Sequence, residues 1–330
     1  MAGQGSYQAN AIEEKLRRSV APLSLTEGLL FFFMLPCRSR IFSFMEPLSP
    51  QEIRSAVRAA LAEDVGSGDV TTLAVVPEQA MAEAMMVARE PLVVAGLDFA
   101  EAAFRELAPA VRIERGTADG RHLQFGEWLL RISGPARAIL TAERVALNFV
   151  QRLSGVATLT ARFVEQMKGT RAKILDTRKT TPGWRRFEKY AVACGGGTNH
   201  RLGLHDMVLI KDNHLVAVQF EPPDPIGAAV RRAREKFPNL KIEVEVDHPE
   251  QVQQALAAGA DTILLDNMDV EQLRTAVHWI NGKALTEASG GVTLSNVKAI
   301  AATGVDYISV GALTHSARAV DVALDFLPRS

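Results

Sequence analysis

Apolar and polar positions follow two different periods along the chain, and the change between them divides it into parts. From about residue 45 to residue 135, helical spacing mixes with short stretches of alternating pattern. These stretches lie at 84–89, 111–114 and 128–132. The mixture predicts a small α+β unit in the first part of the chain.

Two helices of this part have clear sequence signals. Ser49 fits an N-cap, Pro50 fits the first helical position, and Glu52 completes a capping box. A long amphipathic stretch at 136–167 predicts one or two connecting helices. Gly155 lies inside this stretch and predicts a bend or a break.

After residue 171 the pattern changes to strand followed by helix, repeated several times. The expected strands are 172–177, 207–211, 242–247, 262–267, 285–289 and 307–311, and the expected helices are 226–237, 249–258, 270–279 and 295–303. Regular alternation predicts a parallel α/β sheet, and the short, even spacing late in the chain favours a barrel over an open sheet. In a barrel of this kind, functional side chains lie where the strands end.

Composition narrows the function classes. The 330 residues carry 37 basic and 38 acidic side chains, so the net charge of -1 gives no global attraction for nucleic acid or an acidic membrane. The two cysteines, Cys37 and Cys194, are too few for a disulfide framework and lack zinc-site spacing. We expect two free thiols and a cytoplasmic protein.

The first 44 residues differ from the rest. Their apolar run at 29–35 is far too short to span a bilayer, and no small-residue cleavage site follows it. We expect a dispensable extension, with Met45 as the natural beginning.

Charged and small residues gather where the expected strands end. In the third strand Glu243, Glu245 and Asp247 alternate with Val244 and Val246, so the acids share one face. Because helices should cover the valine face, we expect all three acids to point into the barrel, where buried carboxylates need cations. The cations available at the strand ends are Arg178, Lys179, His200, Arg201 and Lys211.

A metal could also neutralise the acids. Glu245 and Asp266 could hold it together with a phosphorylated ligand, directly or through water, and hard oxygen ligands point to Mg²⁺ and not to zinc. Gly195–Gly197 precede the basic run that contains His200 and Arg201, and a triple glycine lets backbone come close to a ligand. Ser289–Gly291 and Gly311–Leu313 follow the last two expected strands, the usual place for a phosphate site in a barrel. The pattern predicts an anionic substrate and a polyphosphate.

Several of these residues also have a purely structural interpretation. Asp176 and Glu243 could be structural partners of Lys179 or Arg178. A group of histidines without partners at metal-ligand spacing is expected to cap or support neighbouring groups: His205, His214 and His315. Arg144 lies beside Glu143 on a helix, where a solvated face is the default. Lys211 ends an apolar strand, which favours function.

Residues 176–214, reading DTRKTTPGWRRFEKYAVACGGGTNHRLGLHDMVLIKDNH, closely resemble the signature segment of the quinolinate phosphoribosyltransferase family. Further matching motifs follow the family's order: EDVGSGDVTT, ERVALNFVQRLSG, EVEVD, LLDN, EASGG and VGALTHS. The resemblance covers about residue 45 to the C-terminus. It implies an incomplete α/β barrel (type II phosphoribosyltransferase) at 156–313 and an N-terminal α/β sandwich domain at 45–155, completed by about 314–330.

The resemblance also implies roles for individual residues. Quinolinate would be held by Thr177, Arg178, His200, Arg201 and Lys211, with Arg144 reaching in from the partner chain of a homodimer. Phosphoribosyl pyrophosphate and its Mg²⁺ would meet Lys179, Glu245 and Asp266 as catalytic residues. The 5-phosphate would be bound by Ser289, Gly290, Gly291, Gly311, Ala312 and Leu313. The implied reaction gives nicotinate mononucleotide, pyrophosphate and CO₂.

Three other functions remain to be weighed. A sister enzyme that takes nicotinate or another base would use the same phosphate machinery, but the number of cations exceeds what one carboxylate needs. A barrel lyase would use Lys211 as a Schiff-base amine, which requires an apolar pocket. A non-catalytic phosphate-binding barrel would give the buried acids no task.

Overall fold

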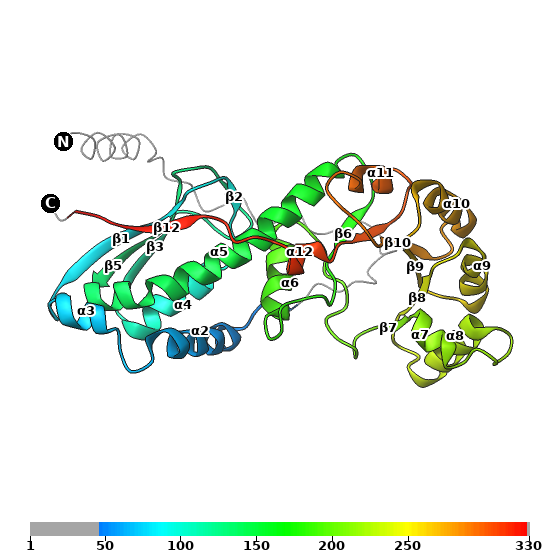
Figure 1. Cartoon of the computed structure of the whole chain (residues 1–330), viewed down its shortest axis with the longest axis horizontal. Helices are drawn as coiled ribbons and strands as arrows, with labels where there is room; N and C mark the ends of the chain where they lie inside the picture. Colours follow the sequence, from blue (N-terminus) through cyan, green and yellow to red (C-terminus); the bar gives the residue numbers. More distant parts are fainter. Residues whose placement is uncertain (1–45, 329–330) are drawn as a thin grey trace, which may run out of the picture. The chain divides into compact units, whose positions relative to one another are not determined.

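The computed structural model describes residues 46–328, which form two sheet-based parts (Figure 1). The extension expected at 1–44 and the thiol of Cys37 lie outside the described residues. No helix within 46–328 has the length and apolarity needed to cross a membrane.

The N-terminal part is built on an antiparallel sheet with the strand order β12-β1-β5-β3. Its strands are β1 (Met81–Ala88), β3 (Arg112–Arg115), β5 (Trp128–Pro135) and β12 (Val322–Phe326), while β2 (Leu92–Val93) pairs with β4 (His122–Leu123). The helices are α2 (Pro50–Val65), α3 (Val70–Val75), α4 (Leu97–Leu107) and α5 (Ala136–Gln166). Because β12 pairs with β1, the end of the chain completes the sheet that its beginning starts.

The predicted helix start is confirmed at α2. The Ser49 side chain accepts a hydrogen bond from the amide of Glu52, and the Glu52 carboxylate accepts one from the amide of Ser49. Ile53, Val57 and Leu61 are buried along one face, as their helical spacing requires.

The break predicted as one possibility at Gly155 is wrong, because α5 is one continuous helix of 31 residues. A Cβ atom at this position would lie 2.0 Å from the carbonyl oxygen of Arg318. The glycine therefore allows the C-terminal segment to cross α5 closely, and the surrounding packing stabilises the helix against the low propensity of glycine.

The second part is a parallel sheet of six strands, each near a helix, with the order β6-β11-β10-β9-β8-β7. The strands are β6 (Lys173–Leu175), β7 (Val208–Ile210), β8 (Ile242–Val246), β9 (Thr262–Asp266), β10 (Leu285–Ser289) and β11 (Tyr307–Ser309). The helices are α6 (Arg185–Cys194), α7 (Asp212–Val216), α8 (Pro225–Lys236), α9 (Pro249–Ala258), α10 (Val270–Ile280), α11 (Val297–Ala301) and α12 (Ala312–His315). The sheet has β6 and β7 as its edges, which confirms the α/β class and the incomplete barrel.

A stack of aromatic rings connects α5 to the segment that follows β6. Phe149 of α5 stacks on Trp184 with ring centroids 5.1 Å apart and on Phe99 with centroids 4.8 Å apart. Offset aromatic pairs of this kind stabilise packing beyond their buried area. The stack supports the loop that carries the basic residues after β6.

Candidate active site

The carboxyl ends of neighbouring strands bring the predicted site residues to one edge of the sheet. Lys179 follows β6, Lys211 follows β7, and Asp266 ends β9 beside Ser289 of β10. Glu245 lies one residue before the carboxyl end of β8, where it pairs with Leu264 of β9. This grouping follows from parallel strands, whose carboxyl ends meet at the same edge.

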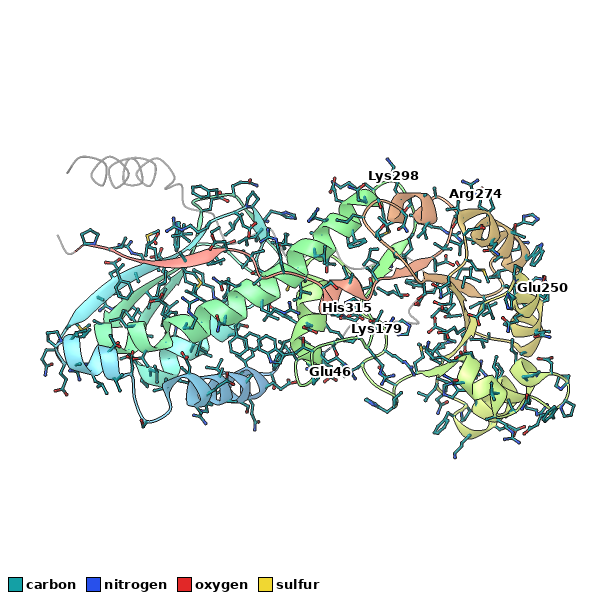
Figure 2. All side chains as sticks on the ribbon, viewed as in Figure 1. Glu46, Lys179, Glu250, Arg274, Lys298 and His315 are labelled. Carbon is teal, nitrogen blue, oxygen red and sulfur yellow. The ribbon has the colours of Figure 1, made fainter. Side chains whose placement is uncertain are left out.

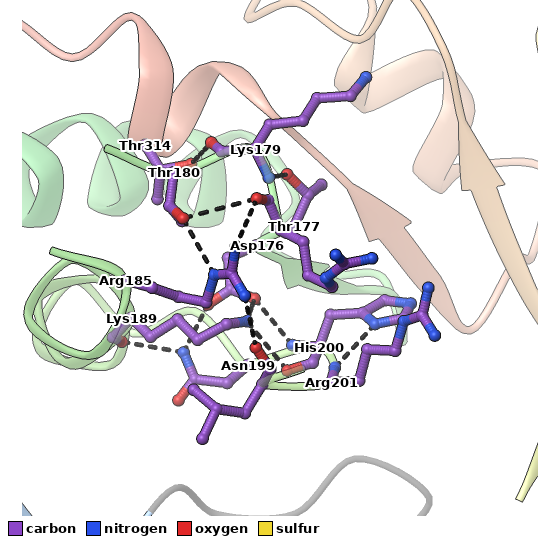
Figure 3. Close-up of polar contacts among 12 residues, drawn as sticks. Asp176, Thr177, Lys179, Thr180, Arg185, Lys189, Asn199, His200, Arg201 and Thr314 are labelled. Carbon is purple, nitrogen blue, oxygen red and sulfur yellow. Dashed lines mark hydrogen bonds and ion pairs between the residues drawn. The ribbon is translucent and has the colours of Figure 1, made fainter. Parts of the chain in front are cut away.

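A buried polar network orders the two basic segments of this edge (Figure 3). Asp176, 0 % exposed, forms an ion pair with Lys189 of α6 and accepts hydrogen bonds from the Asn199 side chain at 2.6 Å and the His200 amide at 2.8 Å. Lys189 also donates to the carbonyl oxygen of His200 at 2.9 Å. The structural partner of Asp176 is therefore Lys189, and the sequence-based alternative of Lys179 or Arg178 is wrong.

Burial opposes both charges of this pair. It raises the pKa of Asp176, against the lowering effect of Lys189 and the other donors, and it lowers the pKa of Lys189 against the effect of Asp176. The hydrogen bonds keep the pair in place, and they tie the end of β6 to the segment that carries His200 and Arg201.

Lys179 is fixed by its main chain while its side chain remains exposed. Its amide donates to the Thr177 hydroxyl at 3.0 Å, and its carbonyl oxygen accepts from the Thr314 hydroxyl at 2.7 Å. The ammonium group has no hydrogen bond or ion pair within residues 46–328, and Figure 3 shows the side chain extending away from the network. Such a group is available to an anion.

Two arginines crowd together nearby without full compensation. Burial, and then the charge of Arg178, lower the pKa of Arg201. The buried Nε of Arg178 has no hydrogen-bond partner in the described part of the chain, whereas Arg201 donates to the carbonyl oxygen of Met207 at 3.2 Å. A bound dianion would satisfy both guanidinium groups.

Lys211 connects this cationic region to the acids. Its ammonium group forms an ion pair with Glu245, and the two side chains are 43 % and 11 % exposed. The ring of His214 accepts a hydrogen bond from the amide of Lys211 at 2.9 Å, so the capping role predicted for His214 is confirmed.

The other inward-facing acid of β8, Glu243, pairs with histidine and not with Lys179 or Arg178. His200 Nε2 lies 3.0 Å from a carboxylate oxygen of Glu243 and 3.4 Å from one of Glu287, which comes from β10. Both acids are 0 % exposed. The third acid expected inside the barrel, Asp247, is exposed beyond the end of β8, because the strand ends at Val246.

The glycine segments after the later strands bring backbone close to this edge. Gly290 has φ of +90°, and a Cβ atom there would lie 2.1 Å from the side-chain oxygen of Asn267. Asn267 itself has φ of +55°, and its amide donates to the Ser289 carbonyl oxygen at 2.9 Å. Only glycine fits at position 290 between these loops.

Comparison with known families matches both parts of the chain. Residues 69–154 match the quinolinate phosphoribosyl transferase N-terminal domain, and residues 156–325 match the C-terminal domain of the same family. The chain belongs to the quinolinate phosphoribosyltransferase family.

Relatives of this phosphoribosyltransferase agree over most of the chain. The nicotinate-nucleotide pyrophosphorylase [carboxylating] of Mycobacterium leprae is 47 % identical over 82 % of this chain and 96 % of its own length. The probable enzyme of that name in Bacillus subtilis is 43 % identical, covering 80 % of this chain and 89 % of its own length. The nicotinate-nucleotide pyrophosphorylase structure from Francisella tularensis has a TM-score of 0.81 at 38 % identity, over 87 % of this chain and 100 % of its own.

One further residue of this phosphoribosyltransferase lies among the predicted phosphate contacts. A Cβ atom at Gly311 would lie 3.1 Å from His315 Nε2 and 3.2 Å from Lys179 Cδ, and Figure 2 shows Lys179 and His315 close together. The sequence assigned His315 only a capping or supporting role. Its position four residues after Gly311, within the short helix α12, is the signal that could have placed it at the site.

Arg144, another predicted site residue, lies on α5 and not at the end of a strand of the parallel sheet. It lies exposed on α5, and its guanidinium forms no hydrogen bond or ion pair with any other described residue. A groove of about 890 Å³ adjoins the same part of α5 and is lined by residues of α2, by Val145 and Asn148, and by residues 182–184, 186 and 187.

Proposed function

We propose that the protein transfers the phosphoribosyl group of phosphoribosyl pyrophosphate to the ring nitrogen of quinolinate, giving nicotinate mononucleotide, pyrophosphate and CO₂ for NAD synthesis. The observation that carries this proposal is the charge repulsion between Arg178 and Arg201, with a buried guanidinium nitrogen of Arg178 that lacks a partner among residues 46–328. Lys211, which follows β7 at the same edge of the sheet, would add a third cation. Three cations near one another suit two carboxylates better than one.

The contacts above support a role for each residue. Arg178, Arg201 and Lys211, with Thr177 and His200, would surround the two quinolinate carboxylates. Lys179 would face the pyrophosphate, because its ammonium group is exposed and its main chain is anchored. The 5-phosphate would lie against the backbone of Ser289–Gly291 and Gly311–Leu313.

Glu245 and Asp266 fit the Mg²⁺ that accompanies the phosphoribosyl donor. Glu245 is one residue before the end of β8 and Asp266 ends the neighbouring strand β9, so their carboxylates can supply the hard oxygen ligands that Mg²⁺ prefers. Bound there, directly or through water, the ion would neutralise charge on the leaving pyrophosphate.

The chemistry needs no covalent nucleophile. When pyrophosphate leaves, positive charge develops at C1 of the ribose, and the carboxylates of Glu245 and Asp266 would stabilise it. Once the ring nitrogen is alkylated, its positive charge stabilises the electron pair left on the adjacent ring carbon when the carboxylate there leaves as CO₂, and a proton taken up at that carbon completes nicotinate mononucleotide. Decarboxylation then requires mainly a positioned substrate and a site that excludes water.

One assay separates this function from that of a sister enzyme. Purified protein is incubated with Mg²⁺, phosphoribosyl pyrophosphate and either quinolinate or nicotinate, and nucleotide and CO₂ are measured together. Equal amounts of both products from quinolinate alone support the proposal, and nucleotide from nicotinate without CO₂ contradicts it. The ion pair of Lys211 with Glu245 disfavours the lyase, since a Schiff-base lysine requires an apolar environment.

Lys211→Ala is expected to raise the KM for quinolinate by about 100-fold or more while the KM for the phosphoribosyl donor rises far less. The reason is that Lys211 contributes a charge to the dicarboxylate pocket but meets the donor side only through Glu245. Steady-state kinetics with each substrate varied in turn measures the two constants. An equal rise in both would contradict the role given to Lys211.

We also propose a cytoplasmic homodimer in which Arg144 of one chain enters the site of the other. The exposed guanidinium and the adjoining groove on α5 support a surface that a partner chain covers. Arg144→Ala and Lys211→Ala proteins are mixed, with subunit exchange, at a quinolinate concentration too low for either variant to react alone. About a quarter of the normal activity is expected to return, because half of the dimers are mixed and each has one intact site. Mixtures that stay inactive despite proven exchange would contradict a shared site.

A further inference from the structure

Both the main chain and the ring of His200 contact other groups of the protein, next to the proposed dicarboxylate pocket. Its amide donates to Asp176 and its carbonyl oxygen accepts from Lys189, so its main chain belongs to the buried network of Figure 3. Its ring Nδ1 accepts a hydrogen bond from the amide of Arg201 at 2.7 Å, and its Nε2 faces Glu243 and Glu287. Both ring nitrogens therefore point at groups of the protein.

The hydrogen bond from Arg201 indicates whether the buried cluster of His200, Glu243 and Glu287 binds a metal ion or contains a protonated ring nitrogen. The three side chains could supply one ligand atom each to a metal ion. An amide nitrogen can only donate, so the Nδ1 of His200 carries a lone pair and the ring proton lies on Nε2. A protonated Nε2 cannot bind a metal, whereas it can donate to the carboxyl group of Glu243.

The electrostatics of the cluster agree with a ring held between acids. Burial acts to lower the pKa of His200, but Glu287 and Glu243 raise it to about 10. A second proton would have to sit on Nδ1, where the Arg201 amide points, so this hydrogen bond opposes the positive charge that the two acids favour, and its geometry is that of a ring with one proton.

We propose that Glu243 and Glu287 are positioning residues of the dicarboxylate pocket, acting through the ring of His200 on the backbone of Arg201. The imidazole connects the acids to Arg201. Its Nε2 faces the two buried carboxyl groups, and its Nδ1 accepts the hydrogen bond from the Arg201 amide, which fixes the backbone from which the Arg201 side chain extends into the pocket. Rigid support of this kind decides how well a binding group is placed. The inference rests on the proposed function, since it assigns Arg201 to the binding of quinolinate.

Two variants of Glu243 separate positioning from charge. Glu243→Met fills similar space without an acceptor, whereas Glu243→Gln loses the charge but keeps an oxygen that can accept from Nε2. We expect Glu243→Met to raise the KM for quinolinate about tenfold and to leave the KM for phosphoribosyl pyrophosphate within about twofold. Glu243→Gln should restore a quinolinate KM close to that of the unchanged protein. Asp306→Asn is a control, because Asp306 bonds Thr286 at the opposite end of β10.

The alternatives give different results. If the acids act only through their charge, both variants make the pocket more positive and lower the KM for quinolinate, which would overturn the proposal. A rise in both KM values, or no change with Glu243→Met, would also overturn it. Failure of the unchanged protein to use quinolinate would instead refute the proposed function. Binding of Zn²⁺ or Mn²⁺ to the unchanged protein, lost in Glu243→Gln, would favour a metal site over the positioning role.

Discussion

Lys189→Met is expected to lower the free energy of unfolding by about 3–5 kcal/mol, the largest stability effect expected of a single side chain in this protein. The side chain of Lys189 is 1 % exposed, and its ammonium group is the cation beside the fully buried Asp176. Its loss leaves a buried carboxylate that must either remain uncompensated or take up a proton. Urea denaturation followed by tryptophan fluorescence and circular dichroism measures the change.

Matched variants show whether the pair itself is responsible. Lys298→Met removes an exposed lysine of α11 and should change stability by less than about 0.5 kcal/mol. The double variant Asp176→Asn with Lys189→Met removes both charges and should recover part of the loss. If the double variant is as unstable as Lys189→Met, the uncompensated carboxylate is not the cause.

The regular alternation after residue 171 was enough to predict the parallel sheet and the edge that carries the site. Strands β8 and β9 and helix α9 lie where the alternating pattern predicts them. Periodicity also placed Glu243 and Glu245 on the inner face, since a strand fixes the direction of alternate side chains. It failed at Asp247, because the pattern continues in the sequence after the strand has ended.

Long-range partners were beyond the pattern. Nothing local pairs Asp176 with Lys189, because a helix must first fold back on the strand end before the two meet. Gly155 gives the same lesson: its small size matters because Arg318, distant in the sequence, crosses the helix there. The sequence identifies Glu287 only as part of the motif EASGG, because its proposed role depends on the imidazole of His200, which comes from another segment.

The motif resemblance filled part of this gap. It assigned Arg178, Arg201 and Lys211 to one pocket. Composition and spacing alone did not say which of the several cations bind the same ligand. The crowding of Arg178 and Arg201 is consistent with that prediction. The resemblance also predicts that Arg144 acts in the site of a second chain, and this side chain is exposed on α5.

Lys179→Met is expected to reduce kcat for nucleotide formation by about 10²–10³-fold, the largest activity effect expected here. The ammonium group would neutralise the pyrophosphate as it leaves, an interaction that strengthens as charge develops on the leaving group. The loop should keep its shape, because Thr177 and Thr314 hold the main chain of Lys179 and not its side chain. Unfolding temperature should therefore stay unchanged, and Lys179→Arg should recover part of the rate.

Lys283→Met removes an exposed lysine just before β10, at the opposite end of the strands, and should leave kcat unchanged. A normal kcat in Lys179→Met would show that pyrophosphate leaves without help from this residue, and the leaving group would then have to be neutralised by the Mg²⁺ proposed at Glu245 and Asp266.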